Sequence, residues 1–171
     1  MNVRPGVRIH SIMRALIDAA VMLSLAACSS TPRPQLAGTP APDRQVVNPP
    51  GIAPLVPAYS VAIRSGDQVF VSGMTGIKPG TQDIVEGGVT AQTRQTLVNI
   101  RTSLEAAGAT LADVNECTVF LMDMTDYAAM NAVYIEFFRV DPPVRAAMAV
   151  TALPRPAARV EIKCSARIRR R

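Results

Sequence analysis

Histidine is almost absent from this chain of 171 residues, because His10 is the only one. It lies in an N-terminal segment that we expect to be removed, so the mature chain would contain no histidine. This excludes the Ser-His and Cys-His nucleophile pairs of many hydrolases. It also excludes the common zinc sites that use histidine ligands.

Aromatic residues are also scarce. The chain has no Trp, and aromatic residues make up 4% of it, whereas hydrophobic residues make up 49%. This composition predicts a compact aliphatic core and disfavours an aromatic platform for stacking nucleic-acid bases. The net charge of +5 includes an arginine-rich C-terminus ending at Arg171. Such a tail could contact phosphates or lipid headgroups, although a solvated terminus explains it as well. Nucleic acid is therefore not an expected partner.

Residues 1–27 have the pattern of a secretory signal: basic residues, a short apolar run, and small residues before a cleavage point. The sequence Leu25-Ala26-Ala27-Cys28 resembles a bacterial lipoprotein box. It predicts cleavage before Cys28, lipidation of Cys28, and a place on the periplasmic side of a membrane. Ser29 favours the outer membrane by the same resemblance. Asp18 departs from the pattern, and a plain secretory signal or an unprocessed helix remains the alternative.

Residues 28–56 begin with this cysteine and are rich in Pro, Ala, Ser and Thr. We expect them to form a mobile tether. The folded domain is expected over residues 57–171.

The rest of the chain predicts a hairpin, a helix, a strand, a second helix and two further strands. The clearest helix spans 89–107, where apolar residues recur at helical spacing and Gly108 follows as a C-terminal cap. Thr125 is the expected N-cap of the second helix, which extends to Phe138. The expected strands are 59–64, 68–72, 116–123, 146–153 and 159–168. This order predicts an α+β fold with a mixed sheet, two helices on one face, and subunits associating through the other face.

Two charged residues stand out in the apolar C-terminal part of the chain: Arg145 opens the expected strand 146–153, and Glu161 lies inside the expected strand 159–168. If these strands are neighbours, both side chains could reach one pocket. A guanidinium can hold a carboxylate with two parallel hydrogen bonds, and a carboxylate can position and polarise water. The alternative is a structural ion pair or two solvated strand ends.

Several motifs of this chain resemble the reactive-intermediate deaminase family (Rid, also called YjgF). The motifs are Val71-Ser72-Gly73, Gln92 through Gly108, Pro143-Val144-Arg145, Leu153-Pro154 and Val160-Glu161-Ile162. The resemblance covers about the last two-thirds of the chain. It implies a chorismate-mutase-like fold, a homotrimer with sites between subunits, and hydrolysis of 2-imino acids to 2-keto acids and ammonia.

The resemblance also implies a role for each site residue. Arg145 would hold the substrate carboxylate, and Glu161 would position water. The other substrate-binding residues would be Tyr59, Ser72, Gly73 and Asn131. No metal or organic cofactor is implied.

Three residues depart from the family pattern: Ala146, Ala147 and Met74 stand where deaminases commonly have Ser or Thr, Cys, and Gln. The alternative function is therefore a lipoprotein that binds small carboxylates without converting them. RNA binding or cleavage, a role attached to some relatives, is a third hypothesis.

Cys117 and Cys164 both lie in expected strands. They could pair in an oxidising compartment. Because strongly apolar strands usually bury unpaired cysteines, we predict two buried free thiols.

Overall fold

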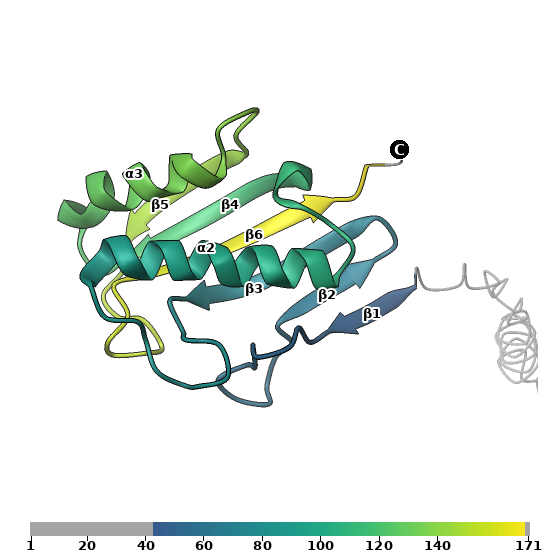
Figure 1. The fold of residues 1–171 in the computed structure, drawn as a ribbon, viewed down its shortest axis with the longest axis horizontal. Helices are drawn as coiled ribbons and strands as arrows, with labels where there is room; N and C mark the ends of the chain where they lie inside the picture. Colours follow the sequence, from purple (N-terminus) through teal and green to yellow (C-terminus); the bar gives the residue numbers. More distant parts are fainter. Residues whose placement is uncertain (1–42, 170–171) are drawn as a thin grey trace, which may run out of the picture. The chain divides into compact units, whose positions relative to one another are not determined.

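A computed structural model describes residues 43–169 of the chain. One six-stranded sheet has the strand order β1-β2-β3-β6-β4-β5, and both helices lie on the same face of it (Figure 1). Neighbouring strands are antiparallel except β4 and β5, which are parallel. The strands are β1 Arg44–Val47, β2 Ala62–Ser65, β3 Gln68–Thr75, β4 Val114–Leu121, β5 Val144–Ala149 and β6 Val160–Arg167; the helices are α2 Gly88–Ala106 and α3 Tyr127–Phe137. The expected α+β class with two helices on one face is confirmed.

The two helices begin and end for local reasons. Helix α2 is followed by Gly108 with φ 82°, which confirms the expected glycine cap. The expected N-cap of the second helix is wrong. Asp123 caps the short 3-10 turn Met124–Asp126 by accepting a hydrogen bond from the Thr125 backbone N–H at 2.8 Å, and α3 follows this turn. An Asp two residues upstream thus supplies the oxygen that we assigned to Thr125.

The sheet begins earlier in the sequence than Pro57, the expected start of the folded domain. Strand β1 pairs antiparallel with β2, and the side chain of Val47 is buried against the core. Residues 44–47 are a strand-forming run inside a Pro-rich segment, and the composition of that segment concealed it. The proposed signal, Cys28 and the first part of the linker lie outside the described residues.

The two C-terminal strands are not neighbours, in contrast to the arrangement that would have placed Arg145 and Glu161 together. Strand β4 lies between β5 and β6 and pairs with both. Their connection therefore crosses one strand rather than forming a hairpin.

Cys117 and Cys164 are directly opposite each other on β4 and β6, with their Cα atoms 4.1 Å apart, and they form a disulfide bond. The prediction of two free thiols is therefore wrong. Both residues are buried in the core beneath the helices. Apolar surroundings suit a thiol and a disulfide equally, and only the strand register distinguishes the two states.

We expect the replacement of Cys117 and Cys164 by alanine to lower the free energy of unfolding by about 2–4 kcal/mol, because the crosslink restricts the unfolded chain. Denaturant titration with and without reductant measures this difference. A thiol assay on the denatured, unreduced protein should find neither cysteine reactive. A reactive thiol at Cys117 or Cys164, or equal stability with and without reductant, would contradict the crosslink.

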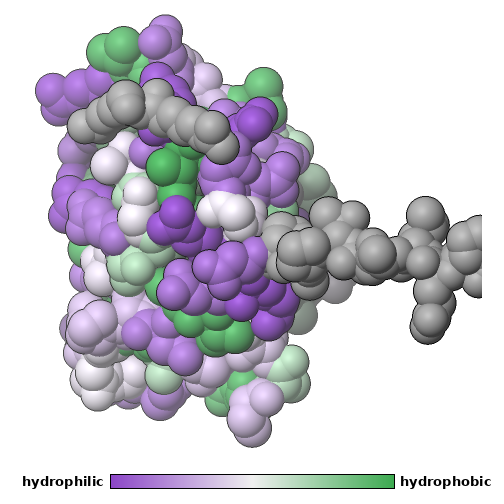
Figure 2. Space-filling model, turned by 90° about the vertical axis from the view of Figure 1, so that its right-hand side faces the viewer, coloured by the Kyte–Doolittle hydropathy of each residue, from purple (hydrophilic) through white to green (hydrophobic). Residues whose placement is uncertain are grey.

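The sheet face away from the helices exposes apolar side chains along its length. Phe70 on β3 is 49% exposed, and Val144 and Met148 on β5 are 71% and 41% exposed. The end of the molecule shown in Figure 2 is mainly hydrophilic, with separate hydrophobic residues. Within residues 43–169, no helix is long and apolar enough to cross a membrane.

Candidate functional site

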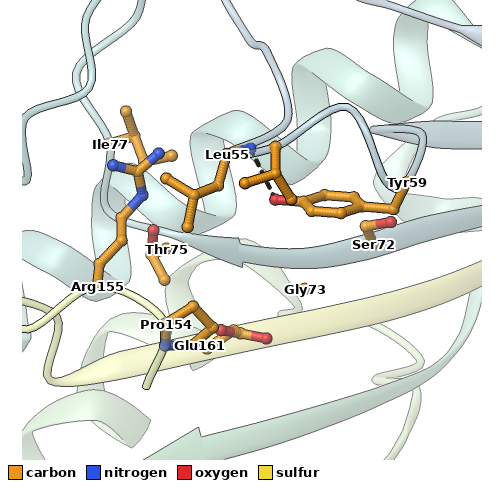
Figure 3. Close-up of a pocket in the computed structure, with 10 residues that line it drawn as sticks. Leu55, Tyr59, Ser72, Gly73, Thr75, Ile77, Pro154, Arg155 and Glu161 are labelled. Atoms are coloured by element: carbon orange, nitrogen blue, oxygen red, sulfur yellow. Dashed lines mark hydrogen bonds between the residues drawn. The ribbon is translucent and has the colours of Figure 1, made fainter.

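A pocket of about 440 Å³ lies on the sheet face away from the helices. Figure 3 shows its lining side chains around the strands β3 and β6. The lining residues are Leu55, Val56, Tyr59, Ser72, Gly73, Thr75, Ile77, Pro154, Arg155 and Glu161. Four of the expected site residues, Tyr59, Ser72, Gly73 and Glu161, are therefore brought together. A pocket of this volume fits a small organic ligand.

Glu161 is the carboxylate of this pocket, and its position depends on Gly73. The register between β3 and β6 shifts between Val71 and Met74, which places one extra residue of β3 in a bulge. The Glu161 side chain lies over Gly73 so closely that a Cβ on Gly73 would be 2.0 Å from Oε1. A side chain at position 73 would therefore displace the Glu161 carboxylate from the place that it occupies here.

The environment of Glu161 favours its protonated form. The side chain is half-buried, and loss of solvation raises the pKa of its carboxyl above the usual range. A carboxyl with a raised pKa exchanges protons at a pH closer to neutral, which is the property that a general base for water requires.

Ser72 and Tyr59 already make hydrogen bonds within the chain. The Ser72 hydroxyl donates to the Ser60 carbonyl at 2.7 Å, and the Tyr59 hydroxyl accepts from the Leu55 N–H at 2.8 Å. The Tyr59 hydroxyl can still donate its own hydrogen, whereas Ser72 retains acceptor capacity. Tyr59 therefore offers the pocket a donor, and it also fixes the segment that carries Leu55.

Arg145 does not line this pocket, and its side chain is on the other face of the sheet. On β5, Arg145 is paired with Cys117 of β4, and Cys117 is paired in turn with Cys164 of β6. Directly paired residues share a face, and Glu161 is three positions from Cys164, so it points the other way. Arg145 and Glu161 are therefore neither a structural ion pair nor a joint site within one copy of the described chain.

Arg145 is instead held by two tyrosines of α3. Its guanidinium donates to the Tyr127 hydroxyl at 3.0 Å and lies 4.5 Å from the ring centroid of Tyr134. Burial raises the pKa of Tyr134 to about 12, so its ring stays neutral beside the cation. Asn131 falls between the two tyrosines on the same helical stripe and is half-buried. The expected site thus divides into two groups, one around Glu161 and one around Arg145.

Arg155 was not among the site residues predicted from the sequence, because it lies in the segment between the two expected strands 146–153 and 159–168. Its side chain lines the pocket that contains Glu161. The guanidinium donates to the Gln82 backbone carbonyl at 2.7 Å and to Gln82 Oε1 at 2.5 Å. A cation between two prolines, in the segment that leads into the strand of Glu161, was the available signal.

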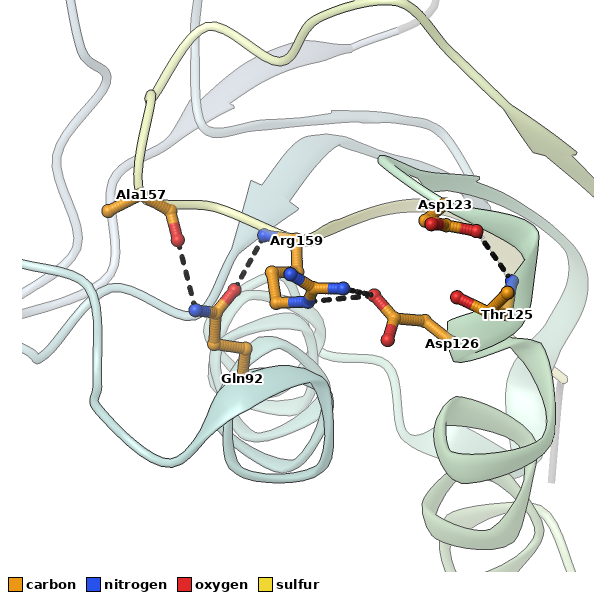
Figure 4. Close-up of polar contacts among 6 residues, drawn as sticks. All are labelled: Gln92, Asp123, Thr125, Asp126, Ala157 and Arg159. Atoms are coloured by element: carbon orange, nitrogen blue, oxygen red, sulfur yellow. Dashed lines mark hydrogen bonds and ion pairs between the residues drawn. The ribbon is translucent and has the colours of Figure 1, made fainter.

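The segment that connects β5 to β6 is anchored by Gln92 of α2, as Figure 4 shows. The Gln92 side chain donates to the Ala157 carbonyl at 3.0 Å and accepts from the Arg159 N–H at 2.7 Å. The Arg159 guanidinium in turn forms an ion pair with Asp126 at 2.8 Å. The Gln92 side chain is buried although it is polar, because it satisfies these backbone groups.

We expect Gln92→Ala to lower the free energy of unfolding by about 1–3 kcal/mol, because it removes the two hydrogen bonds that this buried side chain makes to the backbone of Ala157 and Arg159. Hydrogen exchange should rise most in residues 154–160. Gln68→Ala, at an exposed position of β3, is the control and should change stability little. Equal effects of the two substitutions would show that Gln92 does not hold this segment.

Within residues 43–169, no cluster of three or more acidic, His or Cys side chains could hold a metal ion. The fold is thus a small α+β domain, and its pocket combines the half-buried carboxylate of Glu161 with an apolar wall.

The sequence profile described as Endoribonuclease L-PSP matches residues 52–168. A 2-iminobutanoate/2-iminopropanoate deaminase from Capra hircus is 36% identical over 123 residues, which cover 72% of this chain and 89% of that protein. A RutC family protein from Pyrococcus horikoshii is 48% identical over 97 residues, which cover 57% of this chain and 77% of that protein. The crystal structure of RidA from the Antarctic bacterium Psychrobacter is 36% identical with a TM-score of 0.68, covering 72% of this chain and 99% of that one. The chain belongs to the Rid/YjgF family.

Proposed function

We propose that this protein hydrolyses 2-imino acids to 2-keto acids and ammonia at sites formed between two copies of the chain. The observation that carries the proposal is the division of the expected site into two groups. The Glu161 pocket lacks Arg145, and Arg145 lies on β5, which within residues 43–169 is an edge strand with a partner strand on one side only. A neighbouring copy that presents its β5 edge to the pocket would complete the site.

In the completed site, the two charged residues have separate tasks. Arg145 of one copy holds the substrate carboxylate through its planar guanidinium. Glu161 of the other copy accepts a proton from water while the water oxygen bonds to the imine carbon. That proton passes to the nitrogen and gives a carbinolamine. The hydroxyl proton of the carbinolamine then passes through Glu161 to the nitrogen, the carbon–nitrogen bond breaks, and ammonia leaves as the carbon–oxygen double bond forms. The Tyr59 hydroxyl remains available as a donor to the reacting groups.

The exposed apolar face supports association of copies, and the homotrimer of the family is the assembly that we propose. Phe70, Val144 and Met148 would leave water in such an assembly. The edge of β5 would lie at the junction. Ala146 and Ala147, which replace Ser or Thr and Cys, also lie on β5 and would make the junction less polar.

We also propose that the protein is exported and anchored through Cys28. The signal-like pattern of residues 1–28 and the disulfide between Cys117 and Cys164 support this proposal. Disulfides persist mainly in oxidising compartments such as the periplasm.

The proposed activity is tested by generating 2-iminobutanoate from 2-aminobutanoate with an amino-acid oxidase and measuring ammonia release. Addition of the protein should raise the rate above that of buffer, since the imine also hydrolyses without a catalyst. If the rate equals that of buffer while 2-oxobutanoate binds with measurable heat, the protein binds small carboxylates without converting them.

A further inference from the structure

The pocket that contains Glu161 also contains the guanidinium of Arg155. The proposed hydrolysis of an imino acid with a single carboxylate assigns no role to this cation. Arg155 lines this pocket together with Glu161, Ser72 and Tyr59. In Figure 3, Arg155 and Tyr59 lie at opposite ends of the pocket, with Leu55 between them. The pocket therefore extends from the serine and tyrosine toward a guanidinium along an apolar wall.

The charge of Arg155 is not neutralised by a carboxylate of residues 43–169. Among these residues, its side chain donates to the backbone carbonyl and to the side-chain oxygen of Gln82, and both acceptors are neutral. Arg94, Arg159, Arg167 and Arg169, in contrast, all lie within 3.2 Å of a carboxylate oxygen. A guanidinium carries five N–H donors, so Arg155 retains donors for an anion in the pocket.

Gln82 also fixes the position of this cation. Two bonds from one residue hold two guanidinium nitrogens, and Pro154 and Pro156 restrict the backbone on both sides of Arg155. A guanidinium that is already ordered loses little entropy when it binds a carboxylate. Its environment is thus that of a prepared binding group rather than of a freely moving surface side chain.

We propose that Arg155 is a specificity-determining residue that binds a second carboxylate, and that the preferred substrates are dicarboxylic 2-imino acids of four or five carbons. The inference rests on the proposed function, in which Arg145 of a neighbouring copy holds the carboxylate next to the imine. The substrate then spans the pocket, with its distal carboxylate on Arg155 and its imine carbon at Glu161. Leu55 and Ile77 contact the methylene groups between them.

The test compares pairs of ligands that differ only at the distal end. Hydrolysis of 2-iminosuccinate is measured against that of 2-iminobutanoate, each generated by an amino-acid oxidase. Binding of oxaloacetate is measured against that of 2-oxobutanoate, and 2-oxoglutarate against 2-oxopentanoate. The wild type should favour the dicarboxylate in each pair. Arg155→Gln should reduce that preference about 10- to 100-fold, since a hydrogen-bonded charge pair is lost, and should change the values for the monocarboxylates little.

Two further variants separate recognition from structure. Arg155→Lys keeps the charge but loses the fork that Gln82 holds, and it should retain part of the preference. Arg101→Gln removes one positive charge from the exposed surface of α2 and should leave the preference unchanged.

The outcomes are distinguishable. A preference that Arg155→Gln does not alter would overturn the proposal and leave Arg155 as a structural link to Gln82. Equal losses for both members of each pair would also overturn it, because Arg155 would then hold the carboxylate next to the imine. If no imine is hydrolysed above the buffer rate, the proposed function fails, but the keto-acid pairs still report whether Arg155 recognises a second carboxylate.

Discussion

Glu161→Gln is expected to remove most of the imine hydrolysis and to stabilise the fold at neutral pH. The amide has nearly the shape of the carboxyl and can occupy the same space over Gly73. It cannot accept a proton from water, so the rate should fall by about 10²–10⁴-fold, the usual contribution of a general base.

The gain in stability follows from the direction of the pKa shift. Burial raises the pKa of Glu161 in the folded protein above its value in the unfolded chain. Between these two pKa values the folded state binds more protons, so stability decreases as the pH rises through this window. The stabilising effect is fully present below the unfolded pKa and is lost as the pH passes the folded one. A glutamine at this position never ionises and avoids this loss.

Denaturant titrations of the wild type and Glu161→Gln at several pH values measure this difference, and pH–rate profiles measure the activity. The wild-type rate should fall on acidification at a pH above the ordinary range of a Glu carboxyl. Glu116→Gln, at an exposed position of β4, is the matched control and should change neither quantity. A Glu161→Gln variant that is fully active, or less stable at neutral pH, would contradict the role assigned to this residue.

Arg145→Ala should mainly weaken substrate binding. Loss of a charged, bidentate partner for a carboxylate is worth about 1.5–3 kcal/mol, so kcat/KM should fall about 10- to 100-fold. The kcat/KM of Arg145→Lys should lie between those of the wild type and Arg145→Ala, because an ammonium group keeps the charge but lacks the planar arrangement of donors. Truncation also removes the contacts of Arg145 with Tyr127 and Tyr134, so the melting temperature has to be measured with the kinetics.

Arg139→Ala provides the control, since Arg139 is exposed and donates only to the carbonyl of Glu136 among the described residues. It should leave kcat/KM unchanged. If Arg145→Ala hydrolyses 2-iminobutanoate as fast as the wild type, the carboxylate is bound elsewhere, and Arg155 becomes the first candidate.

The sequence was most informative where local patterns determine structure. The apolar periodicity of residues 89–107 and the following Gly108 predicted α2 within one residue at each end. The alternation around Glu161 predicted β6, because a strand with one buried face has a two-residue period. The expected strand 146–153 was displaced, since the apolar run continues beyond Ala149 into the connecting segment.

Long-range relations were harder to predict, and the site depends on them. No local sequence pattern indicates that β4 lies between β5 and β6. This strand order separates Arg145 from Glu161 within one chain. The register between β4 and β6 places Cys117 opposite Cys164 and so allows the disulfide bond. Arg155 was missed for a related reason, since a pocket residue in a turn has no periodic signal.

A complementation experiment tests most directly whether the site is shared between copies. Arg145→Ala and Glu161→Gln chains carrying different C-terminal tags are co-expressed, and assemblies with both tags are purified. In a ring of three, every mixed assembly contains one site with both residues intact, so about one third of the wild-type activity should return. Mixed assemblies as inactive as either variant alone would show that Arg145 and Glu161 do not act across a junction between copies.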